Sequence, residues 1–327
     1  MRLGTTGAIS IVTFVMLIEG STLSPWAAEI KYPTRPIQII IGYEPGSTDM
    51  GLKPFTDRLQ EYLGQPVSYV YKPGAAGTIG ASFVAKAKPD GYTILGTSQT
   101  PVILSPLTKD LDYKLDDFIP VCRASKSSLI LAVKADSRWK TIREIVAEAK
   151  KSPAKLTYSS AAVFGSNHLV MEEFVKLAGI NMTHVPCKGS APAVTAALGG
   201  HVDMVSSTMA PLSPHLKSGA LRPLGVFEKE RIREFPDVPT FSEVGYPVTH
   251  VVWYAFFAPK GTSEEVVKIF STAIQKVVKE HHHFIEDRLG KISLNPAFLK
   301  YDEFAREVKD YNEEMKRIIK ELMKTIK

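Results

Sequence analysis

The segment Ile37-Gln-Ile-Ile-Ile-Gly-Tyr-Glu-Pro-Gly-Ser-Thr-Asp49 contains the unit that decides the fold. Its first five residues form an apolar run between Pro36 and Gly42, which predicts a buried strand. Pro45–Asp49 has the composition of a turn. Apolar residues then recur at helical spacing as far as Gly64. The segment therefore predicts a strand, a loop and a helix in succession.

The same order repeats along the chain and restarts after Phe118. Short apolar runs predict strands at 37–41, 67–71, 92–95, 129–133, 156–158, 182–185, 202–205 and 224–226. Helical spacing predicts helices near 52–63, 81–88, 166–177 and 191–198, and two more near 266–277 and 304–326; Thr141 and Glu144 have the spacing of a capping box. Repeated strand–loop–helix units predict mainly parallel sheets covered by helices. Two such units predict two lobes with a ligand cleft between them.

The composition excludes several classes of protein. The chain has 327 residues, 44% of them hydrophobic and 23% charged, which excludes a polytopic membrane protein and a disordered polar chain. Its net charge of +6 comes from 40 basic and 34 acidic residues. No basic block is interleaved with aromatic residues, so nothing in the sequence favours a nucleic-acid partner.

The N-terminal segment has the layout of a secretory signal peptide. Arg2 is followed by the mostly apolar stretch Ala8–Ile18, and small residues follow as far as Ala28. The apolar stretch is too short to span a bilayer. We therefore expect residues 1–28 to be removed and the mature protein to be periplasmic. The alternative is a buried N-terminal helix.

The cysteines and the histidine tract match no metal-binding pattern. Cys122 and Cys187 have neither zinc nor redox spacing, and we favour two separate thiols over a disulfide, although the sequence leaves both open. In His281-His-His283, consecutive helical side chains point about 100° apart and cannot converge on one ion. We expect no metal.

Five strand-end loops share a composition that suits an anionic ligand. They are rich in Gly, Ser and Thr and poor in Lys and Arg, and helix N-termini in such loops bind carboxylates through backbone N–H groups. Turns and helix caps favour the same residues, which is the simpler explanation of any single loop. The loops are 42–49, 74–77, 96–100, 159–166 and 206–209.

An ordered set of motifs resembles one receptor family. The motifs are Tyr32-Pro-Thr-Arg-Pro-Ile, Pro45-Gly-Ser-Thr-Asp49, Lys72-Pro-Gly-Ala-Ala-Gly-Thr-Ile-Gly-Ala81, Pro89-Asp-Gly-Tyr-Thr-Ile-Leu95, Asn167-His-Leu169, His184-Val-Pro-Cys-Lys-Gly189 and Pro236-Asp-Val-Pro-Thr240. Together, over about residues 32–261, they resemble the tripartite tricarboxylate transporter substrate-binding family, also called Bug receptors. The resemblance implies an α/β, two-lobed fold of the type II periplasmic-binding-protein kind.

The resemblance also implies a function and a domain division. Members capture a small carboxylated solute by lobe closure and deliver it to a membrane permease, with no cofactor and no catalysis, and we expect a monomer. The expected division is a signal peptide at 1–28, a first lobe at 29–124 plus 228–327, and a second lobe at 125–227. A receptor that signals to a sensor kinase is an alternative with the same solute site.

The family's ligand-binding positions fall on loops of both lobes. The resemblance implies ligand contacts at Tyr43, Gly46, Ser47, Thr48, Asp49, Thr97, Ser98, Ser160, Ala161, Gly165, Ser166, Asn167 and Ser207. The first loop is one residue shorter than the common form. Ser207 stands where many relatives have Asp, which removes an acceptor for an amino group and a repulsive charge near a second carboxylate. We therefore expect an organic acid as the solute and not an α-amino acid.

Individual residues also have alternative interpretations. Asp49 can accept backbone N–H bonds at a helix start, and His168 can be a hydrogen-bonded structural imidazole. Trp253 and Tyr254 can pack in the core or line the cleft. A hydrolase that uses His168 is the enzymatic alternative, but the chain has no Gly-x-Ser-x-Gly, Walker or His-Glu-x-x-His motif.

Overall fold

The computed structural model describes Met1 and residues 31–323. Tyr32–Lys327 form one compact unit, and apart from Met1 the predicted signal peptide lies outside the described residues. The elements are β1 (Ile37–Ile41), α1 (Ser47–Thr56), α2 (Leu59–Leu63), β2 (Val67–Tyr71), η1 (Ala75–Gly77), α3 (Thr78–Ala85), β3 (Thr93–Ser98), η2 (Thr100–Leu104), α4 (Ser105–Thr108), η3 (Leu115–Asp117), β4 (Phe118–Lys134), α5 (Ile142–Lys151), β5 (Thr157–Ser160), α6 (Ser166–Ala178), β6 (Thr183–Pro186), α7 (Ser190–Leu198), β7 (Met204–Thr208), α8 (Met209–Lys217), β8 (Leu221–Val226), β9 (Val251–Pro259), α9 (Glu264–Glu280), α10 (His282–Gly290), β10 (Asn295–Leu299) and α11 (Tyr301–Leu322). None of the helices in residues 31–323 has the length and apolarity needed to cross a membrane.

The first part of the sheet is buried on both faces. Its strand order is β2-β1-β3-β9-β4, and β1 pairs in parallel with β2 and β3. Ile39 and Ile41 pack with residues of α1, α9 and α10, whereas Ile40 packs with residues of α3 and α11. A strand covered on both faces has a continuous apolar run, so the structure confirms the prediction made from residues 37–41.

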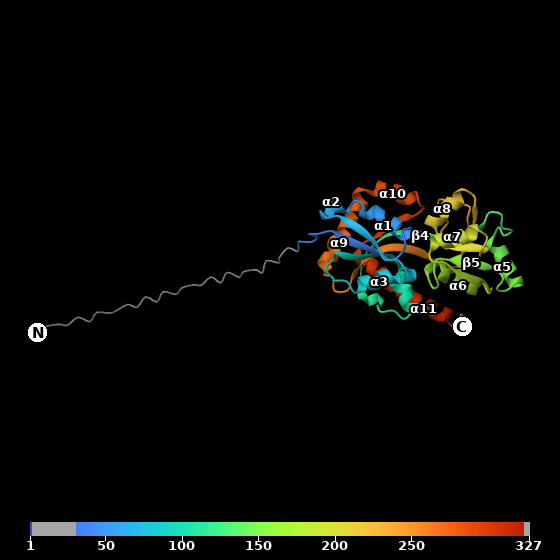
Figure 1. Cartoon of the computed structure of the whole chain (residues 1–327), viewed down its shortest axis with the longest axis horizontal. Coiled ribbons are helices and arrows are strands. Elements are labelled where there is room, and N and C mark those ends of the chain that lie inside the picture. The colour runs from blue at the N-terminus through green and yellow to red at the C-terminus, as the bar shows by residue number, and fades with distance from the viewer. Residues whose placement is uncertain (2–30, 324–327) are drawn as a thin grey trace. The chain divides into compact units, whose positions relative to one another are not determined.

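Strand β4 connects this part of the sheet to the second part (Figure 1). Phe118–Ser128 pairs antiparallel with β9, and Leu129–Val133 pairs antiparallel with β7. The second part continues through β5 and β6, which run parallel to each other, and β5 also runs parallel to β7. Helix α6 packs on one face, and α7 and α8 pack on the other. The change of partner follows Ser128, a few residues after the predicted lobe boundary at 124/125, and the division into lobes itself stays a prediction.

The sheet is mixed, which modifies the expectation of mainly parallel sheets. The strand–helix–strand units 37–98 and 157–208 are parallel as predicted. Strands β4, β8, β9 and β10 add antiparallel pairs. These pairs join segments far apart in the sequence, and no local pattern specifies them.

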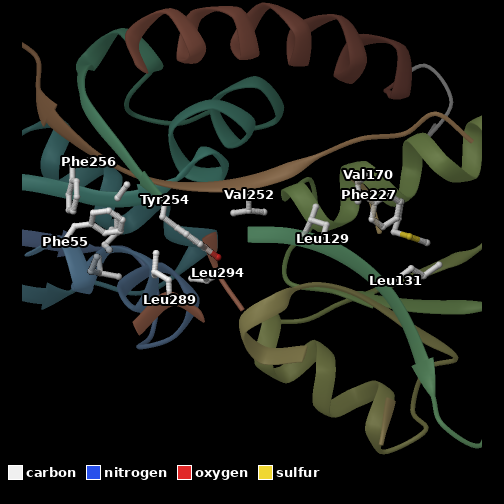
Figure 2. Close-up of a cluster of buried hydrophobic side chains, with 14 of the residues drawn as sticks. Phe55, Leu129, Leu131, Val170, Phe227, Val252, Tyr254, Phe256, Leu289 and Leu294 are labelled. Atoms are coloured by element: carbon white, nitrogen blue, oxygen red, sulfur yellow. The ribbon is translucent and has the colours of Figure 1, made fainter. Parts of the chain in front are cut away.

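One hydrophobic cluster runs past the point where β4 changes partner. Figure 2 shows Phe55 and Phe256 on one side, Tyr254 and Val252 at the middle, and Leu129 with Phe227 on the other side. All of these side chains are at most 6% exposed. The two parts of the sheet therefore share apolar packing behind the strand ends.

The two cysteines are not bonded to each other, in agreement with the favoured interpretation. Cys122 is buried in β4, whereas Cys187 is half-buried after β6. Burial raises the pKa of the Cys122 thiol well above its ordinary value. Both residues therefore behave as ordinary packing groups, and neither is a reactive thiolate.

Candidate functional site

The start of α1 is held by the Asp49 carboxylate. The backbone N–H of Gly46 donates to Asp49 Oδ1 at 2.6 Å, and the Tyr71 hydroxyl donates to Oδ2 at 3.1 Å. The expectation that Asp49 accepts local backbone bonds is confirmed. Its carboxylate therefore shapes the loop that presents Ser47 and Thr48 at the first turn of α1.

Tyr43 closes one side of this loop. A Cβ at Gly77 would lie 2.8 Å from Tyr43 Cζ, so only glycine permits this approach, and Gly77 has φ of 90°. Burial raises the pKa of Tyr43 to about 12, and the nearby hydroxyls of Ser98 and Thr100 act in the opposite direction. The phenol is therefore a neutral donor and acceptor at every physiological pH.

The end of β3 carries the next predicted residues, Thr97 and Ser98, both buried. Ser98 lies opposite Tyr254 in the register of β3 with β9. Gln99, which sequence reasoning missed, holds the two strands together at this point: its Nε2 donates to Val251 O at 2.7 Å, and its Oε1 accepts from Trp253 N at 3.1 Å.

The start of α6 lies beside η2 and is fixed to the end of β7. A Cβ at Gly165 would lie 3.9 Å from Thr100 Cγ2, so the start of α6 in the second part lies against η2 of the first. Asn167 Nδ2 donates to Ser206 O at 3.1 Å, and Ser206 Oγ donates to Asn167 O at 2.9 Å. This reciprocal pair sets the position of Ser166.

The remaining predicted residues of this loop have different surroundings. Ser160 Oγ is 2.8 Å from His184 Nε2, so its side chain is already used inside the protein. Ala161 is half-buried and contributes backbone only. In this loop, the groups left for contact with a ligand are therefore the backbone and the side chain of Ser166.

Three buried hydroxyls have no hydrogen-bond partner within residues 31–323: Ser166, Ser207 and Thr208. Each side chain belongs to a residue that is at most 3% exposed. Leaving such a group unpaired costs about 1–3 kcal/mol, so native proteins keep few of them without a reason. An acceptor supplied by a ligand would satisfy them.

Of these hydroxyls, those of Ser207 and Thr208 lie on opposite faces of β7. Met204 packs with α6 residues and Val205 with α7 and α8 residues, and side chains alternate along a strand. Ser206 and Thr208 therefore lie on the α6 face, and Ser207 lies on the opposite face. Thr208, which the sequence placed in a strand-end loop without assigning it to the site, is on the same face as the Asn167 contact.

Tyr254 connects the two sets of residues. Its ring packs against Gly51 of α1, where a Cβ would lie 2.5 Å from Tyr254 Cδ2. Burial raises the pKa of Tyr254 well above its ordinary value, and the nearby hydroxyls of Ser47, Thr208 and Ser127 oppose that rise. Figure 2 shows its hydroxyl oxygen directed toward the second part of the sheet. Of the two interpretations of Tyr254, the structure confirms packing in the core, and cleft lining stays a prediction.

Three helix starts belong to the candidate site. Those of α1 and α8 lie near Tyr254 through Ser47 and Thr208, and that of α6 lies beside Thr100. None of the three has a side-chain hydrogen bond from its N-cap residue, although Met209 N at the start of α8 donates to Ser127 Oγ at 3.2 Å. The converging side chains are hydroxyls and an amide, together with the already bonded Asp49. Helix N-termini carry a positive partial charge, so this arrangement suits an anion that is recognised by neutral donors.

A large groove lies away from these residues. It has a volume of about 1180 Å³ and is lined by charged side chains together with Trp253 and Tyr311. None of the predicted ligand-binding residues lines it. Within residues 31–323, no group of three or more His, Cys, Asp or Glu side chains could hold a metal ion.

Comparison with known proteins gives consistent matches. The profile of the tripartite tricarboxylate transporter family receptor matches residues 53–323. BugT of Bordetella pertussis is 34% identical over 270 residues, which cover 81% of this chain and 82% of BugT. A solved structure of a periplasmic transporter is 34% identical, with a TM-score of 0.81 over 88% of this chain and 97% of that one. The R. palustris protein Rpa4515, solved with adipate, is 26% identical, with a TM-score of 0.82 over 89% and 98% of the two chains.

Proposed function

The chain belongs to the tripartite tricarboxylate transporter receptor family, whose members are periplasmic solute-binding proteins, and on that basis we propose that it captures a small organic carboxylate in the periplasm. In this proposal residues 1–28 direct export, and a monomer delivers the solute unchanged to a membrane permease. The protein uses no cofactor and catalyses no reaction. The adipate bound to Rpa4515 supports an acid as the solute class.

The unpartnered hydroxyls of Ser166 and Thr208 carry this proposal. They belong to the starts of α6 and α8, and Thr208 lies near Tyr254, which also lies near Ser47 at the start of α1. A carboxylate has two oxygens with several lone pairs and can accept from hydroxyls and from helix N–H groups together. A bound acid would therefore supply the acceptors that the protein lacks.

Binding is coupled to closure in the proposed mechanism. The expected lobes, 29–124 plus 228–327 and 125–227, are joined where β4 changes partner after Ser128. A solute that contacts the starts of α1 and α6 interacts with both lobes and stabilises their closed arrangement. We expect micromolar affinity, about −8 kcal/mol, since the solute must be released to the permease.

The site disfavours α-amino acids. An ammonium group needs an acceptor, and a carboxylate would be the strongest one. Asp49, the acidic residue of the predicted set, already accepts from Gly46 and Tyr71, and Ser207 provides no charge. We therefore expect dicarboxylic and hydroxy acids to bind more tightly than aspartate or glutamate.

Thermal unfolding with a solute panel tests the proposal. The panel contains acetate, succinate, malate, adipate, citrate, benzoate, aspartate and glutamate. At 100 times its Kd, a solute adds about 2.7 kcal/mol to the free energy of unfolding and raises Tm by several degrees. No shift with any acid would contradict the proposal, and tighter binding of aspartate than of malate would contradict the expected specificity.

A matched variant assigns the binding to this site. Thr208→Val keeps the shape of the side chain and removes its hydroxyl. We expect the Kd of the best acid to rise about fivefold, the effect of one hydrogen bond worth about 1 kcal/mol. Thr195→Val, on the exposed side of α7, serves as the control and should bind as the wild type does.

A further inference from the structure

Two histidine rings are stacked beneath the loop that leads into α6. His168 lies in the first turn of α6 and His184 lies in β6. Their ring centroids are 4.0 Å apart, with an interplanar angle of 25°. Tyr158 of β5 stacks with both rings, 4.9 Å from His184 and 6.3 Å from His168 between centroids. Neither histidine belongs to the predicted ligand-binding set.

Each histidine holds one end of this loop. Ser160 Oγ, at the end of β5, is 2.8 Å from His184 Nε2. At the other end, the backbone N–H of Phe164 donates to His168 Nδ1 at 3.0 Å. The residues between these two contacts, Ser160–Gly165, lead directly to the unpartnered hydroxyl of Ser166.

The loop needs such support because Phe164 is strained. Its φ of 57° lies in the left-handed region, which a bulky side chain rarely occupies. Such a conformation is unfavourable and persists only where surrounding contacts determine it. The bond to His168 Nδ1 and the edge-on contact of the Phe164 ring with the His168 ring, at 5.6 Å between centroids, are two contacts of that kind.

The contacts of the two rings indicate which nitrogen atoms carry a proton. His168 Nδ1 accepts, so the proton of the neutral ring is on Nε2, which lies 3.5 Å from Glu172 Oε1; the Tyr158 hydroxyl donates to that same oxygen at 2.6 Å. Burial, with a smaller contribution from His168, lowers the pKa of His184 to about 4, and Glu172 acts in the opposite direction. His184 is therefore neutral at physiological pH and available to the Ser160 hydroxyl.

We propose that His168 and His184 are positioning residues for the solute, because they hold the loop Ser160–Gly165 in the conformation that presents the first turn of α6. This inference rests on the proposed function. The histidines do not touch the solute themselves. They act through two hydrogen bonds, from Phe164 N to His168 Nδ1 and between Ser160 Oγ and His184 Nε2. A substitution should therefore weaken solute binding only when it removes the ring nitrogen that makes the bond.

Asparagine and glutamine substitutions test this directly, since their amides replace different ring nitrogens. In His168→Asn the amide oxygen takes the place of Nδ1 and keeps the acceptor for Phe164 N. In His168→Gln the amide takes the place of Nε2, so the contact with Glu172 is kept and the acceptor for Phe164 is lost. At position 184 the order reverses, because Nε2 is the atom that meets Ser160.

The readouts are the Kd of the tightest-binding acid of the panel by calorimetry and the exchange rate of the Phe164 amide hydrogen without solute. We expect His168→Asn and His184→Gln to stay within about threefold of the wild-type Kd. His168→Gln and His184→Asn should weaken binding by about fivefold or more, as the loss of one hydrogen bond predicts. The Phe164 amide should exchange faster in His168→Gln than in His168→Asn. His283→Gln, an exposed histidine, is the control.

The outcomes separate this inference from the proposed function. Tight binding in the wild type with equal Kd values for the Asn and Gln variants would overturn the positioning role alone. Equal Phe164 exchange in both His168 variants would overturn it as well. No binding of any acid by the wild type would overturn the proposed function and this inference together.

Discussion

At the scale of single residues, paired and unpaired buried hydroxyls should have opposite effects on the stability of the solute-free protein. Ser166 at the start of α6 and Ser206 in β7 are both buried, but Ser206 bonds to Asn167 and Ser166 has no partner within residues 31–323. A buried polar group without a partner lowers the stability of the solute-free protein. Alanine substitutions of these two serines can therefore be compared directly.

Removing the unpaired hydroxyl should help folding and harm binding. We expect Ser166→Ala to raise the free energy of unfolding by up to about 1 kcal/mol without solute, and to weaken solute binding about fivefold. Ser206→Ala should lower stability by about 1 kcal/mol because it removes the hydrogen bond from Ser206 Oγ to Asn167 O, while the bond from Asn167 Nδ2 to the backbone of residue 206 stays. Urea unfolding and calorimetry measure both quantities. A large loss of stability in Ser166→Ala would show that its hydroxyl is already paired.

The buried His250 predicts how stability depends on pH. Its side chain is 8% exposed and lies 3.0 Å from the Tyr311 hydroxyl, and burial lowers its pKa from 6.5 to about 4. Between these values the unfolded chain binds a proton that the folded chain does not. Stability should therefore be constant above about pH 6.5 and fall toward pH 4, by at most about 1.4 kcal/mol per pH unit from this residue.

Comparison with His250→Gln isolates this contribution. Urea unfolding at pH 7.5 and pH 5 should give a smaller loss of stability for the variant than for the wild type. An identical loss in both proteins would mean that His250 is charged when folded, or that other groups produce the whole effect.

The sequence predicts a site residue when the position of that residue depends on its neighbours along the chain, and not when it depends on strand pairing. The loops that hold Ser47 and Ser166 were predicted because helix starts after strands have a recognisable composition, and the resemblance to the receptor family assigned the two serines to the site. Gln99, Thr208 and Tyr254 meet only through the register of β9 and β7 with their neighbours, and no spacing rule supplies that register. The same holds for Ser207, because the face of the sheet on which its side chain lies depends on which residues of β7 point toward α6.

At the scale of elements, the local units were predicted and the long-range ones were not. The capping box of Thr141 and Glu144 and the stop of α6 at Gly179 agree with the sequence patterns. Strand β4 was missed over its first half because Pro120 and a polar stretch interrupt the apolar run. Helix α8 was missed because it contains Pro214, and prolines disfavour helix interiors.

The last helix is tied to the sheet by a partly buried ion pair. Arg123 of β4 has a side chain 8% exposed, bonds to the carboxylate of Glu307 on α11, and donates from Nε to Ala297 O at 2.7 Å. Burial lowers the pKa of Arg123, and Glu307 opposes this. Without Glu307 the guanidinium would keep its desolvation cost and lose its compensating charge.

We expect Glu307→Gln to destabilise the protein by about 2 kcal/mol, less than a fully buried pair because Glu307 is partly exposed. Glu313→Gln is the control, since its pair with Lys316 is exposed and should contribute less than about 0.5 kcal/mol. Urea unfolding measures both. Equal small effects would show that water compensates Arg123.

At the scale of the whole molecule, two chain crossings join the two parts of the sheet. One is β4 at Ser128–Leu129, and the other is the segment that leaves β8 at Val226 and enters β9 at Val251. Both crossings lie behind the strand ends where Tyr254 meets Ser47 and Thr208. In the proposed mechanism, a solute bound at those ends would draw the two parts together about the crossings.

Small-angle X-ray scattering tests that motion. Saturating solute should lower the radius of gyration of the wild type, because contacts with both parts favour the closed population. Thr208→Val should need about five times as much solute as the wild type for the same decrease, in line with its weaker binding. Tight binding with an unchanged radius of gyration would mean that the protein is already closed around its site, and solute release would then require opening driven by the partner.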